Sequence, residues 1–377
     1  MLVKSQSAKQ PAMFRKLFPA LLLALAACAP HAHPIASAPP PVVTEPAQKP
    51  VWAFEQSDLV PDPAFRFGRL DNGMRYIVRH NATPPGQGEV RLYVDAGSTS
   101  ETEAERGYAH FIEHMAFNGS THVPEGDMVK LLEREGLAFG ADTNATTSFN
   151  FTLYKLNLPR NDPKLLDTAL MLMRETASEL ALAPSAIDSE RGVVLSEKRE
   201  RDTFALRNLM DRLGFLYPDA HFVQRLPIGT TQALNAATTD GLQGLYSRIY
   251  KPENTTLTVV GDFDPDQVEK DIRQHFADWK AAPASPKPSE GPVDAARADK
   301  TALYIDPALS ERITISRNGP WLDEKDTAQN RKLGLLRQIG YGAINGRLER
   351  LANAEHPPFR GAGLGTSPWL SSPGLVK

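Results

Sequence analysis

The alternation of apolar and polar residues predicts several β-strands. Residues 65–80 read as strand, Asp-Asn-Gly turn and strand, a pattern typical of a β-hairpin. Apolar and polar side chains alternate in residues 88–98 and 146–159. Side chains that are β-branched are frequent in residues 254–263. Further along, residues 312–319 have a shorter pattern of the same kind. We therefore expect a strand in each of these segments.

Apolar residues at helical spacing predict helices between and after the strands. The clearest pattern is that of residues 161–182, where Pro163 stands near the start and Leu165, Leu166 and Ala169 begin an apolar stripe. The predicted helices cover residues 107–120, 121–137, 161–182, 184–217, 264–279 and 323–354. Because strands and helices do not alternate strictly as β-α-β units, we expect an α+β fold.

Two segments rich in Pro and Ala divide the chain. Residues 29–55 cannot bury a core and are expected to form an extended tether, and residues 281–300 are expected to form an interdomain linker. The first domain then spans residues 60–280. Residues 301–377 remain for a smaller second domain.

Residues 1–28 have the features of a bacterial secretion signal. Basic Arg15 and Lys16 precede an apolar run, residues 17–27, that is too short to span a bilayer as a helix. Cys28 follows Leu-Ala-Ala, which resembles the lipobox, where the cysteine becomes the lipidated first residue of the mature protein. We therefore expect a periplasmic lipoprotein, anchored to the outer membrane through its lipid alone. The alternative is an ordinary signal peptide in which Cys28 is incidental.

Composition limits the kinds of partner and of metal site. The formal net charge of −3 is close to zero, so nothing indicates a nucleic acid or an anionic surface as partner. Cys28 is the only cysteine, which excludes a disulfide within the chain and a cysteine-based zinc site. Any metal must therefore be held by His, Asp or Glu.

The stretch GYAHFIEHMAFNGS, residues 107–120, contains two histidines at helical spacing. His110 and His114 are four residues apart, so on a helix both imidazoles face the same side and can bind one zinc ion. Glu113 lies beside that face, where it could take a proton from a zinc-bound water. His-x-x-Glu-His is a metalloprotease signature, but the spacing alone is equally compatible with an ordinary helix that binds no metal.

A catalytic zinc needs a third protein ligand, and the acidic helix expected over residues 184–217 offers two candidates. Glu190 and Glu197 are seven residues apart, which places them on one face, two helical turns from each other. One could bind the ion while the other orients a ligand, and the spacing does not say which. The alternative is a charged, solvated helix, which we expect for residues 198–202.

Five segments along the chain carry a family resemblance. They are HFIEHMAFNGS, GADTNATTSFNFTLY, SERGVVLSEKRE, RLPIGT and YKPENTTLTVVGDFDP. The first and third resemble the two signatures of the insulinase or pitrilysin family of zinc peptidases, the inverzincins, and the other three are similar to further segments of that family in the same order. The resemblance covers residues 65–280 well and residues 300–377 more loosely.

The resemblance implies a role for each residue of the candidate site. His110, His114 and Glu197 match the zinc ligands of the family. Glu113 matches its general base, and Glu190 matches an acidic residue that supports the site without binding the metal.

The resemblance also implies a mode of substrate binding. Asn144 and Ala145 match a segment that offers backbone and amide groups to an extended peptide, which adds as a strand to a sheet edge. From the residues alone, Asn144 is equally well explained as a turn residue before the strand.

These correspondences imply a zinc-dependent endopeptidase with one Zn²⁺ per chain, although manganese or cobalt could occupy the same ligands. It would hydrolyse peptides or unfolded polypeptides through zinc-activated water, with Glu113 as the general base. Residues 60–280 would form the catalytic domain, a mostly antiparallel sheet covered by helices. Residues 301–377 would form part of a second, inactive-type domain of similar kind.

Members of this family usually pair two related halves around a closed chamber. The second half commonly supplies an Arg and a Tyr near the reacting carbonyl, and we find no counterpart for them in this sequence. We therefore expect a fragment or truncated chain, or one that works with a partner subunit. The alternative function is a non-catalytic or weakly active binding or scaffold subunit that needs a partner half to complete the chamber.

Overall fold

The computed structural model describes residues 52–138, 140–283, 288, 300–317 and 324–366. The expected signal sequence with Cys28 lies outside these residues, as do nearly all of the expected tether and most of the expected linker. Within the described residues, no helix combines the length and the apolar character that crossing a membrane requires.

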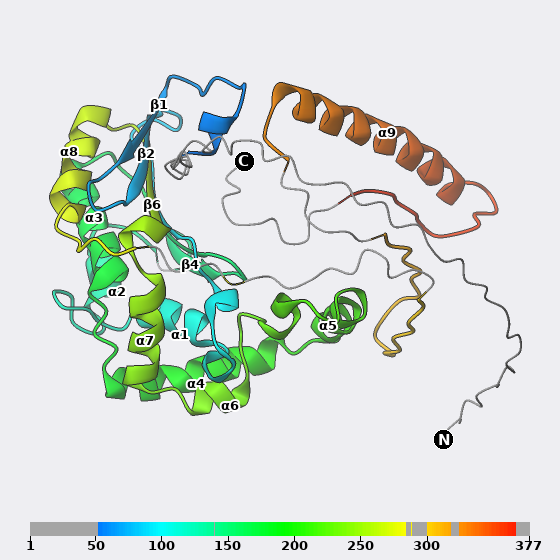
Figure 1. Cartoon of the computed structure of the whole chain (residues 1–377), viewed down its shortest axis with the longest axis horizontal. Coiled ribbons are helices and arrows are strands. Elements are labelled where there is room, and N and C mark those ends of the chain that lie inside the picture. The colour runs from blue at the N-terminus through cyan, green and yellow to red at the C-terminus, as the bar shows by residue number, and fades with distance from the viewer. Residues whose placement is uncertain (1–51, 139, 284–287, 289–299, 318–323, 367–377) are drawn as a thin grey trace, which may run out of the picture. The chain divides into compact units, whose positions relative to one another are not determined.

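Six strands of the described residues form one mixed sheet (Figure 1). They are β1 (Phe65–Arg69), β2 (Arg75–His80), β3 (Gly88–Val94), β4 (Thr143–Thr147), β5 (Thr152–Leu158) and β6 (Thr255–Gly261). The order across the sheet is β1-β2-β6-β3-β5-β4, and neighbours run antiparallel except β2 and β6. The expectation of an α+β fold with a mostly antiparallel sheet is confirmed.

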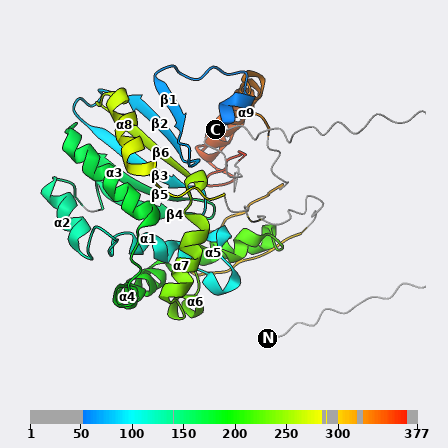
Figure 2. The ribbon, with the colours of Figure 1, turned by 60° about the vertical axis from the view of Figure 1, so that its left-hand side comes forward.

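Helices cover the sheet and extend beyond one end of it. They are α1 (Tyr108–Met115), α2 (Asp127–Arg134), α3 (Pro163–Ser178), α4 (Pro184–Arg201), α5 (Phe204–Leu216), α6 (Thr231–Asn235), α7 (Thr239–Ile249), α8 (Pro265–Phe276) and α9 (Ala328–Ala352). Short 3₁₀ turns lie at Ala53–Gln56, Ser98–Ser100, Glu103–Glu105, His221–Gln224 and Pro252–Asn254. Helices α3 and α8 cover one face of the sheet (Figure 2), while α1 packs against α4, α7 and β4.

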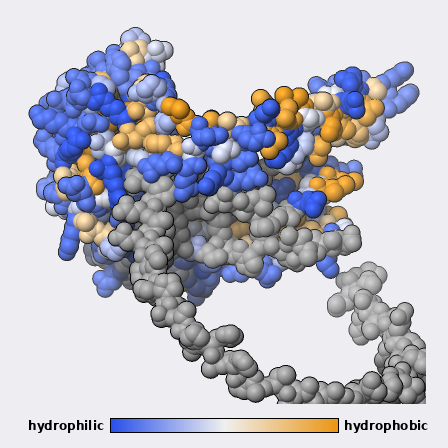
Figure 3. Space-filling model, turned by 45° about the horizontal axis from the view of Figure 1, so that its top comes forward, coloured by the Kyte–Doolittle hydropathy of each residue, from blue (hydrophilic) through white to orange (hydrophobic). Residues whose placement is uncertain are grey.

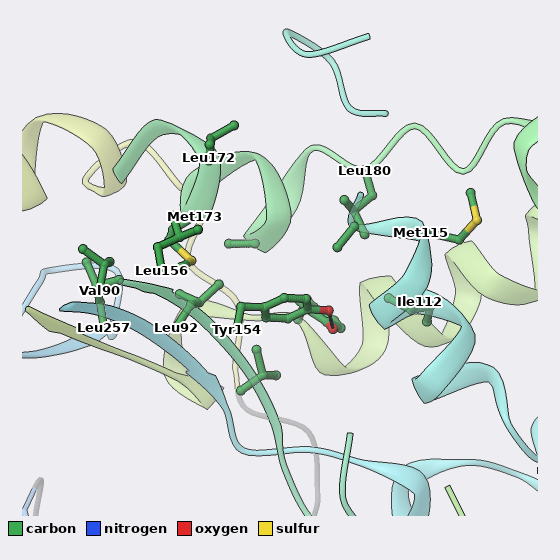
Figure 4. Close-up of a cluster of buried hydrophobic side chains, with 14 of the residues drawn as sticks. Val90, Leu92, Ile112, Met115, Tyr154, Leu156, Leu172, Met173, Leu180 and Leu257 are labelled. Carbon is green, nitrogen blue, oxygen red and sulfur yellow. Dashed lines mark hydrogen bonds between the residues drawn. The ribbon is translucent and has the colours of Figure 1, made fainter. Parts of the chain in front are cut away.

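The hydrophobic core lies between the sheet and α3 and continues to α1 (Figure 4). Its labelled side chains include Val90 and Leu92 of β3, Leu156 of β5, Leu257 of β6, Leu172 and Met173 of α3, and Ile112 and Met115 of α1. Burying one such side chain contributes about 1.5–3 kcal/mol to folding. Because Ile112 and Met115 are part of this core, α1 is held against it along its apolar side.

The single strand expected over residues 146–159 is wrong, because a turn divides it into β4 and β5. The carbonyls of Ser148 and Phe149 accept hydrogen bonds from the amides of Ser98 and Thr99, at 3.1 and 2.7 Å, instead of continuing a strand pair. The Phe149 side chain packs against a separate small apolar cluster around Phe222. The break is a local turn, in which the amide of Ser148 donates to the carbonyl of Phe151 at 2.8 Å, and contacts with distant segments hold this turn in place.

The helical tract expected over residues 184–217 is confirmed except for a break at Asp202 and Thr203, which divides it into α4 and α5. Thr203 begins α5 by accepting a hydrogen bond from the amide of Leu206 at 3.2 Å, which is the geometry of an N-cap. Helices α6 and α7 were not anticipated.

The region expected to form a second domain, residues 301–377, has less regular structure than the sequence predicts. Residues 312–317 form no strand, and residues 318–319 lie outside the described residues. Ile313 and Ile315 are more than nine-tenths exposed, and a strand without a pairing partner is not stable. The helix predicted over residues 323–354 is confirmed as α9. It begins later than expected, after Thr327, whose side chain accepts a hydrogen bond from the amide of Asn330 at 3.1 Å.

Exposed apolar residues are concentrated in α9. The face of the molecule shown in Figure 3 has apolar side chains exposed among mostly hydrophilic ones. Helix α9 has six large apolar side chains that are exposed to solvent: Leu333, Leu335, Leu336, Ile339, Ile344 and Leu351. None of the residues of α9 is buried.

Two glycines set the point at which α1 begins. Gly107 and Gly229 both have positive φ, at 105° and 66°, and their backbones touch. A Cβ on Gly229 would lie 2.3 Å from the carbonyl oxygen of Arg106 and from the Cα of Gly107. The chain therefore needs glycine at 229 both for its conformation and for the close approach.

Gly229→Ala should destabilise the protein by at least about 2 kcal/mol, because it adds a backbone clash to the ordinary cost of a left-handed conformation. Gly126→Ala is the matched control, since Gly126 has φ 77° but open space around it, and should cost about 1 kcal/mol. Urea denaturation measures both. Equal losses in the two variants would show that the contact with Gly107 does not constrain α1.

Candidate metal centre

The buried helix α1 carries both histidines and the glutamate between them. Phe111, Ile112 and Met115 are fully buried, which fixes the rotation of the helix about its axis. His110 is 4% exposed and Glu113 is 9% exposed, so the polar residues of α1 are also largely removed from water. Helix α4 packs against α1 and brings a row of acidic residues to it.

One nitrogen of each histidine and one oxygen of Glu197 converge on a single point. His110 Nε2 and His114 Nε2 are 3.2 Å apart. Glu197 Oε2 lies 3.5 Å from the first and 3.3 Å from the second. Among the described residues, these three form the one group of at least three His, Cys, Asp or Glu side chains close enough to hold a metal ion.

The spacing of these three atoms fits a tetrahedral zinc ion. Zinc lies about 2.0–2.1 Å from nitrogen and oxygen ligands, and tetrahedral geometry then places the ligands about 3.3 Å from one another. The three measured separations lie around this value. The donor set of two imidazoles and one carboxylate also leaves a fourth position open, as catalytic zinc sites do.

Glu190 contacts the ring nitrogen of His114 that faces away from Glu197. His114 Nδ1 donates to Glu190 Oε1 at 2.7 Å, which leaves Nε2 as the nitrogen that faces Glu197. The Asn118 amide donates to the other oxygen of Glu190 at 3.0 Å. The structure therefore separates the two acidic candidates: Glu197 lies with the Nε2 atoms of both histidines, and Glu190 lies behind one of them.

The two histidines differ in their electrostatic surroundings. Burial lowers the pKa of His110 to about 3, so its imidazole is neutral, as a metal ligand must be. No hydrogen-bond partner for its buried Nδ1 lies among the described residues. Burial also lowers the pKa of His114, but the hydrogen bond to Glu190 and the surrounding carboxylates outweigh it and raise the pKa overall.

Glu113 faces the same region and is held by a residue that the sequence did not single out. Thr147, the last residue of β4, donates its hydroxyl to Glu113 Oε2 at 2.5 Å. Burial raises the pKa of Glu113 above its ordinary value, although this hydrogen bond acts in the opposite direction. No local pattern identifies Thr147, because its position depends on the turn that ends β4.

The segment expected to be plainly solvated, residues 198–202, also makes specific contacts. Arg201 Nη2 forms an ion pair with Glu197 Oε1, the oxygen that does not face the histidines. Lys198 Nζ donates to the carbonyl of Gly229 at 2.8 Å. Residues 199–202 are exposed, as expected, whereas Lys198 is half-buried. The four-residue spacing of Glu197 and Arg201 was the signal that could have indicated the pair.

Asn144 and Ala145 lie within β4, at the edge of the sheet. Asn144 is therefore a strand residue and not a turn residue before the strand. Its Oδ1 accepts from the Ala145 amide at 2.8 Å, and Thr146 Oγ1 donates to the Ala145 carbonyl at 2.8 Å. Both backbone groups of Ala145 are thus bonded to neighbouring side chains.

Glu101 holds the first turn of α1 from outside the helix. Its two carboxylate oxygens accept from the amides of Gly107, at 3.0 Å, and Ala109, at 2.8 Å. These amides have no partner within the helix, and a carboxylate near a helix N-terminus is favourable. Burial nevertheless raises the pKa of Glu101 to about 8. Sequence reasoning missed this residue, because it lies outside the predicted helix.

Two sequence models of one peptidase family match the chain. The model described as insulinase (peptidase family M16) matches residues 76–213, and the model described as peptidase M16 inactive domain matches residues 236–348. Together they cover about two thirds of the chain.

Curated relatives are similar over most of this chain. The probable zinc protease PqqL of Haemophilus influenzae is 31% identical over 77% of the chain and 31% of its own length. A zinc protease PQQL-like of Arabidopsis thaliana is 30% identical over 78% of the chain and 31% of its own length. The chain therefore spans about a third of the length of these relatives.

Solved structures share the fold. The first half of the periplasmic protease PqqL from Escherichia coli is 32% identical, with a TM-score of 0.60, over 63% of this chain and 50% of that one. A mutant of the ferredoxin protease FusC, in complex with Arabidopsis ferredoxin, is 28% identical, with a TM-score of 0.61, over 78% of this chain and 32% of that one.

At about pH 5, Glu101→Gln should lower the free energy of unfolding by about 1–3 kcal/mol, because the amide NH₂ that replaces one carboxyl oxygen faces a backbone N–H that then lacks an acceptor. Urea denaturation measures the loss. A variant as stable as the wild type would show that Glu101 does not cap α1.

The stability of the wild type and that of Glu101→Gln should depend differently on pH. Native Glu101 keeps its proton up to about pH 8, whereas the unfolded chain loses it near pH 4.5. Since the native state binds the extra proton between these values, the wild type should lose stability, relative to Glu101→Gln, as the pH rises from about 5 to about 8. Parallel stability curves for the two proteins over this range would contradict the raised pKa.

Proposed function

Because the chain belongs to the insulinase family of peptidases (family M16), we propose that it is a zinc-dependent endopeptidase that hydrolyses peptides or unfolded polypeptides. The observation that carries the proposal is the tetrahedral spacing of His110 Nε2, His114 Nε2 and Glu197 Oε2. Relatives described as zinc proteases support the choice of metal.

In this proposal, His110, His114 and Glu197 hold the zinc, and Glu190 fixes the ring of His114. A zinc ion held there would supply Lewis-acid chemistry, polarising a peptide carbonyl and lowering the pKa of water. Glu190 favours the tautomer of His114 whose Nε2 is free to bind, because its carboxylate can only accept the Nδ1 proton.

Glu113 would act as the general base. Its carboxylate takes a proton from the attacking water and passes it to the leaving amine. The raised pKa that burial gives it makes the carboxylate a stronger base, and Thr147 holds one of its oxygens so that the other is available. The water attacks directly, so no covalent bond forms between the chain and its substrate.

An extended substrate would bind along β4. Edge strands present unpaired backbone groups to which another strand can add, and β4 lies at the edge next to Glu113. Asn144 and Thr146 cover the backbone of Ala145, so a substrate strand would replace these two contacts with its own. Main-chain hydrogen bonds of this kind give affinity without selecting a sequence.

Localisation and assembly are part of the same proposal. A chain anchored to the outer membrane through Cys28 would act in the periplasm, and the Escherichia coli relative is described as periplasmic. A partner subunit or a further half of the protein would close the chamber, since the matched relatives are about three times as long as the matched part. The alternative, a non-catalytic scaffold subunit, is disfavoured because ligands and base are all in place.

Glu113→Gln should reduce peptide hydrolysis by about 100-fold or more while leaving about one zinc per chain, because it removes the base without removing a ligand. Glu197→Ala should lose the zinc as well. Cleavage of a quenched fluorescent peptide and elemental analysis measure the two effects. Undiminished turnover by Glu113→Gln would show that the base is another residue, and a wild-type chain that binds no zinc would refute the proposed function.

Ala145→Pro should raise KM about fivefold, because it removes one amide that a substrate strand would use, worth about 1 kcal/mol. Proline is tolerated on an edge strand where the amide does not pair with the sheet. Ala145→Gly keeps the amide and is the control. If both variants have the KM of the wild type, substrates do not pair with β4 at this position.

A further inference from the structure

The two oxygens of Glu197 have different partners. Oε2 lies 3.5 and 3.3 Å from the Nε2 atoms of His110 and His114. Oε1 forms the ion pair with the guanidinium of Arg201. A carboxylate held in this way presents one oxygen to the metal position and keeps the other one away from it.

The end of α4 is what makes this contact possible. Glu197 and Arg201 are one helical turn apart, with the acidic residue first, which is the favourable order for a pair at this spacing. Arg201 is the last residue of α4, before the chain turns at Asp202 and Thr203. The helix therefore ends just after the guanidinium has been placed beside the ligand.

The surroundings of Glu197 give this pair more than its usual effect. The carboxylates of Glu113, Glu190 and Glu197 all lie around the two imidazoles. Arg201 is the positively charged side chain that contacts this group among the described residues, and its charge acts on both His110 and Glu113. A divalent ion held there would, together with the guanidinium of Arg201, balance the charge of the three carboxylates.

We propose that Arg201 is a positioning residue for the metal: it holds Glu197 so that only Oε2 is offered to the ion. This inference rests on the proposed zinc site and goes beyond it by assigning a residue that does not bind the metal. A partner of a metal ligand typically changes the metal affinity by 10- to 100-fold when it is removed. By comparison, an isolated ion pair on an exposed helix contributes almost nothing to stability. The side chain of Arg201 is 55% exposed, so a purely structural ion pair at this position would have little effect.

The test compares Arg201→Ala with Arg199→Ala. Arg199 is an exposed arginine on the same helix and has no ion pair among the described residues, so it controls for the loss of one positive charge. Zinc affinity is measured by competition with a chromophoric chelator. Arg201→Ala should weaken zinc binding about 10- to 100-fold, Arg201→Lys should fall between it and the wild type because it keeps the charge without the planar fork, and Arg199→Ala should stay within about twofold.

Cobalt gives a second readout that a purely structural role would not change. Co²⁺ binds to the same kinds of ligand, and its visible absorption weakens when the coordination number rises. In Arg201→Ala, Glu197 is free to offer both oxygens, so the absorption per bound cobalt should fall. In Arg199→Ala it should match the wild type.

Three results would overturn the inference. The first is equal zinc affinity and equal cobalt spectra in Arg201→Ala and Arg199→Ala, which would leave the proposed function intact. The second is a loss of zinc affinity in Arg201→Ala that is matched by an equal loss of stability in its metal-free form, since Arg201 would then act on the fold. The third is a wild-type chain that binds no zinc, which would refute the proposed function as well.

Discussion

The burial of α1 is the constraint on which the candidate site depends. One side of the helix is part of the hydrophobic core through Ile112 and Met115, and the other side carries His110 and Glu113, which are almost as inaccessible to water. A short helix of eight residues is not stable on its own. Its position is set by this packing together with the Gly107–Gly229 contact and the Glu101 cap at its first turn.

Burial of this kind imposes an electrostatic cost, and the partners of the site residues offset it. A buried carboxylate or imidazole without a partner would be unfavourable. Glu113 is bonded to Thr147, Glu190 to His114 and Asn118, and Glu197 to Arg201. The buried Nδ1 of His110 has no such partner among the described residues. The polar side of α1 is therefore stabilised mainly by residues from β4 and α4, and the site and the fold share the same contacts.

Most of the elements and the core of the site were predictable from the sequence, for identifiable reasons. His110, Glu113 and His114 are close in sequence, so helical periodicity alone brings them together. Periodicity could not distinguish Glu190 from Glu197, because seven residues place both on one face. The family resemblance suggested Glu197 as the ligand, and the packing of α4 against α1 places it beside both histidines. The break at Thr203 had a local signal, since threonine favours an N-cap. The break after Thr147 was hidden by the continuous alternation of residues 146–159. It is a turn in which the Ser148 amide donates to the Phe151 carbonyl, and backbone bonds from Ser98 and Thr99 hold it.

Helix α4 combines the remaining requirements in one rigid element. Glu190 lies behind His114, Glu197 lies one heptad later beside both histidines, and Arg201 lies one turn beyond it. A seven-residue step returns to nearly the same face of a helix, and a four-residue step stays beside it. The three side chains therefore lie along one side of α4 at a spacing that the backbone fixes, and α4 has to be straight only between Glu190 and Arg201. The helix can therefore end immediately after Arg201, because each residue of α4 that acts on the two histidines or on Glu197 has already been placed.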